Sequence, residues 1–220
     1  FFQAEDGIRD SVASRGLGAI GMVLFFFLVV GPVEEVVKLL AVRLYAYNDG
    51  RFDAVLDGAV YGAMAGLGFA VIENALYITR QLPTAELDLG VALIGAGGGI
   101  TAVRALAGPG HVIYSAIAGY YLGLAKFNPG RRGPIVVKGI LIAAFVHATY
   151  NATVGIGSAV IGAITGLSGL APFIIYVVIY DGFLGLFLLG KIQQYRTSYW
   201  QATASARSEP DLEAELTEFE

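Results

Sequence analysis

The chain contains no cysteine, which excludes disulfide bonds and thiolate chemistry. Charged residues are also scarce: they make up 15% of the 220 residues, whereas 56% are hydrophobic. Together with 30 glycines, this balance is typical of a helical protein embedded in a lipid bilayer. Nothing in the sequence suggests a nucleic-acid partner. We therefore expect an integral membrane protein.

The two ends of the chain differ from the apolar region between them. Residues 1–18 lack the basic-then-apolar order of a signal peptide and resemble translated sequencing-adapter sequence. We interpret them as a non-native leader, with one or more native amino-terminal helices missing. Residues 196–220 are polar and then acidic, which predicts a disordered tail. The intervening residues, 19–195, should form one helical transmembrane domain.

The apolar stretches predict an all-α, polytopic bundle of about five to seven membrane helices, some of them short or kinked. Glycine-rich residues 90–106 and 155–171 are the short candidates, and Gly108-Pro109-Gly110 should kink or break the chain. Residues 126–138 form the most basic loop, which favours the cytoplasmic side. The clear spans are expected at about residues 19–45, 55–79, 104 or 111 to 126, 135–153 and 172–192.

A stripe of glycines marks one face of the second predicted span. Gly58, Gly62 and Gly66 recur every four residues, a spacing that lets two helix backbones approach closely. Glu73 follows Gly66 by seven residues and so lies within about 20° of the same face. We therefore expect its carboxylate to face the packed interior of the bundle and not the lipid.

The first predicted span carries two adjacent carboxylates, Glu34 and Glu35, in an otherwise apolar run. An ionised side chain at the centre of a bilayer costs roughly 3 kcal/mol or more, so each needs a compensating partner. Lys38 follows Glu34 by four residues and can pair with it, which would leave Glu35 free to point elsewhere. Alternatively, both carboxylates neutralise Lys38 and Arg43 at the end of a helix.

Four ionisable side chains on four predicted spans lie at a similar depth. We counted the depth of each residue from the cytoplasmic end of its span at 1.5 Å per residue. The depths are roughly 16 to 25 Å for Glu35, Glu73, His111 and His147. The two histidines are the only ones in the chain. Ionisable residues inside a membrane are candidates for a functional site, so we expect these side chains to form one.

Such a layer of carboxylates and imidazoles supports two kinds of hydrolysis. A carboxylate can activate water as a general base, or glutamate and histidine side chains can bind a divalent metal that activates the water. The sequence contains no HExxH motif, so spacing alone does not establish a metal. His147 and Asn151 are one helical turn apart and can both line an oxyanion site.

The segments around these residues resemble, in order and context, those of the PrsW family of intramembrane proteases. That family is related to the CPBP proteases, which include the prenyl-protein CAAX endopeptidases. The resemblance spans Gly31 to Asn151 and lies on four predicted spans. It rests on Glu34-Glu35-Val-Val-Lys38, Gly66-Leu-Gly-Phe69-Ala-Val-Ile-Glu73-Asn74-Ala-Leu-Tyr77, Arg104 with His111, and His147-Ala-Thr-Tyr-Asn151.

The resemblance implies cleavage of a membrane-associated protein substrate in a prokaryotic cell membrane. In the best-known family role, the substrate is an anti-sigma factor cut at site 1.

The resemblance also implies roles for individual residues. The implied catalytic residues are Glu34, Glu35, Glu73, His111 and His147. We prefer Glu35 as the base because Lys38 can pair with Glu34. If a divalent metal such as zinc is present, its ligands would be Glu35, Glu73, His111 and His147. The residues expected to bind substrate or support the catalytic groups are Lys38, Asn74, Arg104 and Asn151.

Two other classes of protein fit the same residues. A transporter or lipid-handling protein would also place glutamate and histidine at mid-membrane and use glycine-interrupted helices. It should show an internal repeat, and we find none. A non-catalytic receptor or immunity-type protein would have no reason to align both histidines with three glutamates.

Asp181, in the middle of the last predicted span, belongs to no motif. Its carboxylate either partners a tyrosine or backbone group or contributes to the site.

Overall fold

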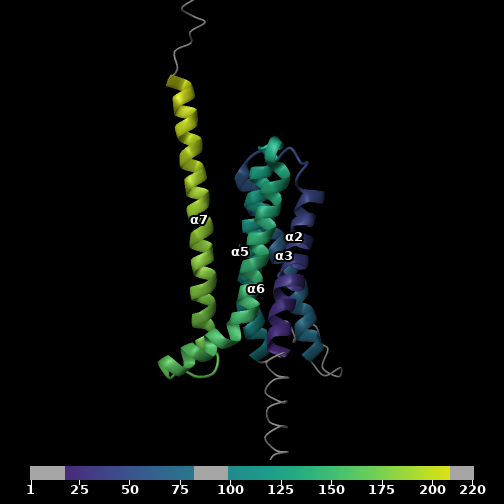
Figure 1. The fold of residues 1–220 in the computed structure, drawn as a ribbon, viewed down its shortest axis with the longest axis vertical. Helices are drawn as coiled ribbons and strands as arrows, with labels where there is room; N and C mark the ends of the chain where they lie inside the picture. The colour runs from purple at the N-terminus through teal and green to yellow at the C-terminus, as the bar shows by residue number, and fades with distance from the viewer. Residues whose placement is uncertain (1–17, 82–98, 209–220) are drawn as a thin grey trace, which may run out of the picture. The chain divides into compact units, whose positions relative to one another are not determined.

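The computed structural model describes residues 18–81 and 99–208, which contain only helices and short connections. The all-α prediction is therefore confirmed for this part of the chain. The chain divides into two units, residues 1–184 and 185–220, and the last helix continues from the first unit into the second. The elements are, in order, η1 (Phe26–Val30), α2 (Gly31–Tyr45), α3 (Val55–Gln81), α5 (Gly99–Lys126), η4 (Pro129–Arg131), α6 (Arg132–Thr165) and α7 (Ala171–Ser208) (Figure 1).

The first predicted span is helical from Gly18 to Tyr45, but its hydrogen-bond pattern changes in the middle. The π-helical turn η1 lies there, with the N–H of Gly31 bonded to the carbonyl of Phe26. Pro32, in the first turn of α2, has no N–H to donate, so the regular i to i−4 ladder is interrupted at this point. The two adjacent glutamates follow directly after this interruption.

α3 and α5 pack along each other through the glycine stripe predicted from the sequence. A side chain at Gly58, Gly62 or Gly66 would collide with a backbone carbonyl oxygen of α5. At Gly66 that oxygen belongs to His111. The small residues therefore allow the two backbones to touch, and they place His111 at a fixed distance from α3.

α5 is the central helix of the first unit, since it contacts α2, α3 and α6 and nearly all of residues 114–125 are buried. Pro109 lies inside this helix, which continues from Gly99 to Lys126. The break predicted as one outcome at Gly108-Pro109-Gly110 is therefore absent. Membrane helices tolerate an internal proline because neighbouring helices and local adjustments can satisfy the freed backbone groups.

Two predicted boundaries in the second half of the chain are wrong. The sequence predicts a separate short element at residues 155–171, but α6 continues to Thr165 and ends at Gly166, whose φ of 71° favours glycine. Its glycines cost some helix propensity, yet glycine is common in membrane helices. α7 likewise continues to Ser208, so the stretch predicted to be a disordered tail begins as helix, and residues 209–220 lie outside the described residues.

Helices long and apolar enough to cross a membrane account for most of the described chain. They are Gly18–Tyr45, Val55–Tyr77, Pro129–Thr165 and Ala171–Gln201. α5 runs beside three of them as a largely buried helix. The described residues therefore form a polytopic helical bundle with four candidate membrane spans.

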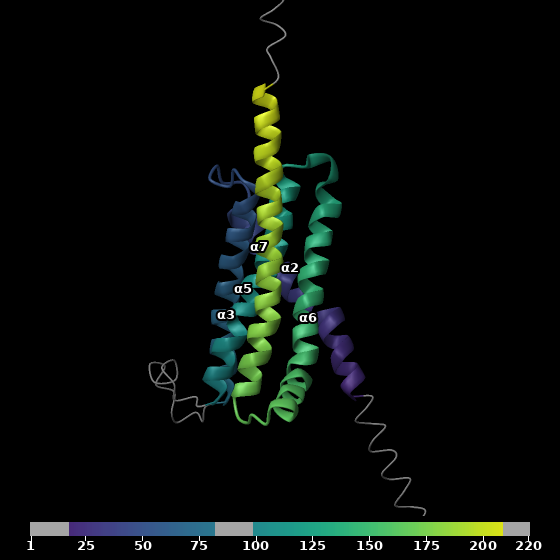
Figure 2. The same cartoon turned by 90° about the vertical axis from the view of Figure 1, so that its left-hand side faces the viewer.

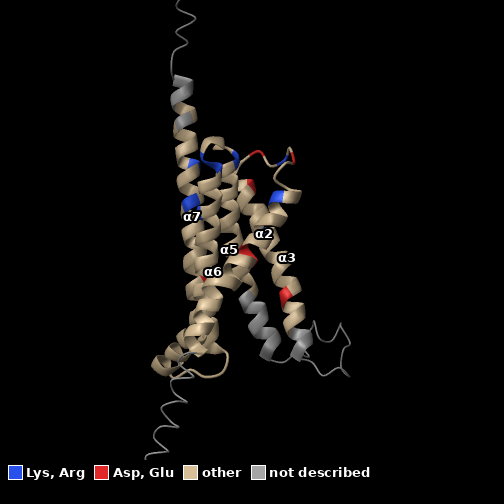
Figure 3. Ribbon diagram, turned by 45° about the vertical axis from the view of Figure 1, so that its right-hand side comes forward, with Lys and Arg blue, Asp and Glu red and all other residues tan. Residues whose placement is uncertain are grey.

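Basic side chains gather at one end of the first unit. The connection between α2 and α3 and the one between α5 and α6 lie at the same end in both views (Figures 1 and 2). Blue segments mark this end of α2 and the start of α6 (Figure 3). The positive-inside rule predicts that this is the cytoplasmic end, the orientation that residues 126–138 predict from the sequence alone. The basic residues here include Arg43, Arg51, Lys126, Arg131 and Arg132.

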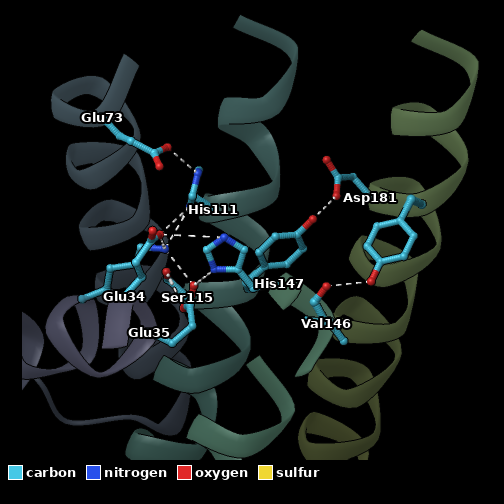
Figure 4. Close-up of polar contacts among 11 residues, drawn as sticks. Glu34, Glu35, Glu73, His111, Ser115, Val146, His147 and Asp181 are labelled. Atoms are coloured by element: carbon cyan, nitrogen blue, oxygen red, sulfur yellow. Dashed lines mark hydrogen bonds and ion pairs between the residues drawn. The ribbon is translucent and has the colours of Figure 1, made fainter. Parts of the chain in front are cut away.

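Tyrosines join the first part of α7 to α5 and α6. The hydroxyl of Tyr114 donates to Oδ1 of Asp181 at 2.8 Å, and the hydroxyl of Tyr180 donates to the carbonyl of Val146 at 2.7 Å (Figure 4). Asp181 is buried, with 5% of its surface exposed. The tyrosine partner that one interpretation of the sequence gives to Asp181 is therefore confirmed.

Candidate active site

Side chains from all five described α-helices surround one cavity of about 410 Å³. Its polar wall contains Glu34 of α2, Glu73 of α3, His111 of α5, and His147 and Asn151 of α6. Of the four side chains predicted to lie at one depth, Glu73, His111 and His147 line this cavity, and Glu35 contacts His147 from outside the lining. The rest of the wall is apolar or aromatic and consists of Met22, Phe25, Phe26, Val30, Tyr77, Tyr114, Tyr150, Val154 and Phe173.

Glu35 is the most enclosed member of this cluster, with no part of its side chain exposed. Its Oε1 accepts hydrogen bonds from Nζ of Lys38 at 2.7 Å and from Nδ1 of His147 at 3.0 Å. Its Oε2 accepts a third from the hydroxyl of Ser115 at 3.1 Å (Figure 4). A buried carboxylate needs such donors, because an unpaired charge away from water is costly. Glu35 therefore ties α2, α5 and α6 together as a buried anion.

Both histidines turn one ring nitrogen toward a carboxylate. Nε2 of His111 lies 3.0 Å from Oε2 of Glu73, and Nδ1 of His147 lies 3.0 Å from Oε1 of Glu35 (Figure 4). An ionised carboxylate only accepts hydrogen bonds, so we assign the ring protons to these two nitrogens. The other two nitrogens then carry lone pairs, and the rings meet edge to face with centroids 4.9 Å apart.

Glu34 differs from Glu35 in that it lines the cavity and its Oε2 is not held by a hydrogen bond. This oxygen lies 3.8 Å from Nε2 of His147, 4.0 Å from Nδ1 of His111 and 3.5 Å from Nζ of Lys38. It is buried and has no hydrogen-bond partner within the described part of the chain. A cation or a water molecule would satisfy a carboxylate oxygen that faces two imidazole lone pairs in this way.

The same three side chains fit a divalent metal ion. Glu34, His111 and His147 each offer one ligand atom, and the three atoms lie within 4.8 Å of one another. Two imidazoles and a carboxylate form the ligand set of several catalytic zinc sites, which keep a further position for water. Carboxylates commonly hold the outer nitrogens of metal-bound histidines, as Glu35 and Glu73 do here.

Among the described residues, Lys38 is the neighbour that would compete with a metal at this site. Its Nζ lies 2.9 Å from Nδ1 of His111, the nitrogen that faces Glu34. The ammonium group also lies 4.3 Å from the ring centroid of Phe69, a cation–π contact that helps to hold it in place. Lys38 would have to turn away from His111 before that nitrogen could bind a metal.

The ion pair predicted between Lys38 and Glu34 is present, but Lys38 also pairs with Glu35, which we expected to be free. The sequence pairs Lys38 with Glu34, but Nζ lies closer to Glu35, at 2.7 Å compared with 3.5 Å. Residues three and four apart both lie on the same helix face, so spacing alone cannot choose between them. Glu35 is therefore not free, and the three side chains grouped for a metal contain Glu34 in place of Glu35 and Glu73.

The four residues predicted to support the site lie in different places. Lys38 contacts the cluster directly, and Asn151 lines the cavity. Asn74 lines a separate groove together with Gly108 and Pro109. The side chain of Arg104 lies outside the described residues.

Two polar residues of the site were missed in the sequence. Ser115 donates to Glu35, and Tyr114 lines the cavity with its ring centroid 5.4 Å from that of His147. Both follow His111 by about one helical turn and so share its face of α5. Helical spacing from His111 could have found them, although no local signal indicates that Tyr114 bonds to α7.

A buried cluster of carboxylates and imidazoles around a cavity is the kind of site that membrane-embedded hydrolases need. A family model described as "PrsW family intramembrane metalloprotease" matches residues 6–182 of the chain. The chain therefore belongs to the PrsW family, which confirms the resemblance inferred from its motifs. The matched range begins within residues 1–18, the stretch interpreted as a leader.

Three bacterial relatives, each named Protease PrsW, are similar to this chain. The protein of Geobacillus kaustophilus is 33% identical over 125 residues, which cover 57% of this chain and 49% of the relative. That of Clostridioides difficile is 32% identical over 127 residues, covering 57% and 49%. That of Bacillus subtilis is 30% identical over 173 residues, covering 78% and 66%. The chain spans about half the length of the first two relatives. No solved structure matches it significantly.

Proposed function

We propose that this chain forms the catalytic core of an intramembrane endopeptidase that hydrolyses a peptide bond in a membrane-associated protein. The position of Glu34 carries the proposal. Its Oε2 lies within 4.0 Å of one nitrogen of each histidine and has no hydrogen-bond partner among the described residues. Membership of the PrsW family supports the same activity.

The residues around Glu34 hold the two imidazoles in a defined orientation. Glu35 holds His147 through Nδ1, and Glu73 holds His111 through Nε2, so each ring directs one lone pair toward Glu34. A water molecule beside Glu34 can pass a proton to its carboxylate in this geometry. Asn151 lines the same cavity, and its amide can donate a hydrogen bond to the oxygen that becomes negative.

A divalent metal such as zinc would be held by Glu34, His111 and His147. When bound, it would supply Lewis-acid activation of water at neutral pH. Glu35 and Glu73 would keep the two imidazole rings in the same orientation. Lys38 would leave Nδ1 of His111 and remain beside Glu35, whose charge it compensates.

The lining of the cavity favours an apolar substrate segment. Its volume of about 410 Å³ lies within the usual range for ligand pockets, and much of its wall is aromatic, including Phe25, Phe26 and Phe173. A peptide bond can reach Glu34 only where the substrate backbone is locally unwound, because a helix surrounds its own backbone with side chains. The family resemblance supports a single-span anti-sigma factor cut at site 1 as the substrate.

Cleavage of a single-span membrane protein with an anti-sigma-factor ectodomain, by the full chain in proteoliposomes, tests this proposal. Glu34→Gln should lower the cleavage rate by about 100-fold or more, because an amide cannot accept the proton. Asp53→Asn makes the same chemical change at an exposed loop position and should leave the rate unaltered. Undiminished cleavage by Glu34→Gln would contradict the proposal.

Metal analysis of the same preparations separates the two hydrolytic mechanisms. Stoichiometric zinc in the wild type, lost in His111→Ala and His147→Ala, would identify the histidines as ligands. Chelator-resistant cleavage that still depends on Glu34 would identify a glutamate base. No cleavage by the folded wild type under either condition would favour the transporter or lipid-handling alternative.

A further inference from the structure

A second cavity lies between α2 and α6 and is separate from the catalytic one. It has a volume of about 230 Å³ and shares no lining residue with the catalytic cavity. Most of its wall is aliphatic, which suits a hydrocarbon chain. The aliphatic residues are Val36, Leu39 and Leu40 of α2, Leu122 of α5, and Val136 and Ile140 of α6.

Two arginines line the cytoplasmic end of this groove. Arg43 lies near the end of α2 and Arg132 at the start of α6, where basic residues gather (Figure 3). The guanidinium of Arg43 stacks on the ring of Tyr47, 4.4 Å from its centroid, and Nε of Arg132 donates to the carbonyl of Ala125 at 3.3 Å. Within the described residues neither arginine forms an ion pair with a carboxylate. Both guanidinium groups can therefore still bind an anion.

The surroundings of Tyr47 add to the positive charge of this end. Nζ of Lys126 lies 5.2 Å from the Tyr47 ring centroid and donates to the carbonyl oxygens of Tyr47 and Phe52. The nearby Asp49 is already bonded by Arg51 through two guanidinium contacts of 2.9 and 3.0 Å, which hold the pKa of that carboxyl below its usual range. Within the described residues, no carboxylate of the α2–α3 connection forms an ion pair with Arg43, Lys126 or Arg132.

Tyr47 supplies an independent indication of a ligand. It lines the groove, only 5% of its surface is exposed, and its hydroxyl has no hydrogen-bond partner among the described residues. A buried phenol usually finds an acceptor, since leaving the hydroxyl unbonded is costly. An oxygen-rich headgroup at this end of the groove would provide that acceptor.

We propose that the groove between α2 and α6 binds one anionic phospholipid of the cytoplasmic leaflet. Its phosphate lies between Arg43 and Arg132, Tyr47 donates to a headgroup oxygen, and an acyl chain follows the aliphatic wall between the two helices. Guanidinium groups match the oxygens of a phosphate, and basic pockets between membrane helices on the cytoplasmic side are typical sites for such lipids. A zwitterionic lipid fits less well, because its positively charged headgroup ammonium would face the three cations Arg43, Lys126 and Arg132.

The test is lipid binding and does not depend on proteolysis. The full chain in dodecylmaltoside is titrated with dioleoyl-phosphatidylglycerol and, separately, with dioleoyl-phosphatidylcholine, and the bound lipid is counted by native mass spectrometry. We expect phosphatidylglycerol to bind at least fivefold more tightly than phosphatidylcholine. Arg43→Gln/Arg132→Gln should remove this preference, and Tyr47→Phe should weaken it about threefold.

Arg131→Gln/Lys138→Gln is the matched control, because it removes the same charge from the same end of the bundle at residues that do not line the groove. It should retain the preference. An equal loss in both double variants would overturn the proposal in favour of general surface charge.

Ile140→Trp tests the acyl-chain part of the groove. It keeps both arginines but fills the groove, so it should weaken the binding of both lipids. Undiminished binding would likewise overturn the site. Full competition by glycerol 1-phosphate would show that the headgroup anion alone is recognised and that the groove binds no acyl chain.

Discussion

Nζ of Lys38 lies 2.9 Å from Nδ1 of His111, a ring nitrogen that also faces Glu34. The lysine ammonium therefore occupies the lone pair of this nitrogen, through which a divalent metal would have to bind. Two cations cannot share this position, because like charges a few ångströms apart in a buried site repel by several kcal/mol. The positive charge of Lys38 should therefore lower the affinity of the cluster for a divalent metal.

Lys38→Met should increase the affinity of the site for a divalent metal. The change frees Nδ1 of His111 and removes a positive charge from the cluster, so we expect cobalt(II) to bind about tenfold more tightly or better. The visible absorption of cobalt(II), titrated into the apoprotein in detergent, measures this. Lys38→Arg keeps the charge and should remain near the wild-type affinity. Equal affinity in Lys38→Met and the wild type would show that the lysine does not compete.

Glu34 and Glu35 should respond differently when each is changed to glutamine. Glu35→Gln leaves Lys38 and His147 without their buried anion and should lower the free energy of unfolding by about 3 kcal/mol or more. Glu34→Gln should change it by less than about 1 kcal/mol, since Oε2 of Glu34 accepts no hydrogen bond within the described chain. Unfolding in mixed detergent micelles compares the two, and equal losses would contradict these roles.

Gly66→Ala should damage the site through the backbone. The new methyl group would collide with the carbonyl of His111, which should destabilise the protein by about 1–3 kcal/mol and reduce cleavage. Gly68→Ala is the control on the same helix, because a side chain there meets no atom within 4 Å. It should be neutral or slightly stabilising, since alanine favours helix over glycine. Thermal unfolding and cleavage assays of both variants show whether the effect depends on contact with α5.

The bond between Tyr114 and Asp181 should stabilise the docking of the first part of α7. Tyr114→Phe removes the donor and leaves a buried carboxylate without it, so we expect a loss of about 1–3 kcal/mol. Asp181→Asn keeps an acceptor oxygen and should cost less. Limited proteolysis of the segment between α6 and α7 follows the docking. If Tyr114→Phe and the wild type are cut at the same rate, the bond does not hold α7.

Much of the fold could be predicted because the relevant signals are local. Long apolar runs predict membrane helices, and the four-residue repeat of Gly58, Gly62 and Gly66 indicates the face of α3 that meets α5. The end of α6 could not be predicted in the same way. Its glycines are compatible with both helix and loop, and the bilayer favours the helix because it offers no water to bond free backbone groups.

The sequence by itself indicated which ionisable side chains meet in the candidate site, because such residues in apolar spans need partners and Glu35, Glu73, His111 and His147 lie at a similar predicted depth, whereas Ser115 and Tyr114 were missed. It also determined the family, through short motifs placed in order along the chain. Only the tertiary structure decided which glutamate faces the cavity. Adjacent residues of a helix point about 100° apart, so either glutamate could face inward until α5 and α6 are in place. Lys38, Ser115 and His147 enclose Glu35, and Glu34 is left beside the two imidazole lone pairs.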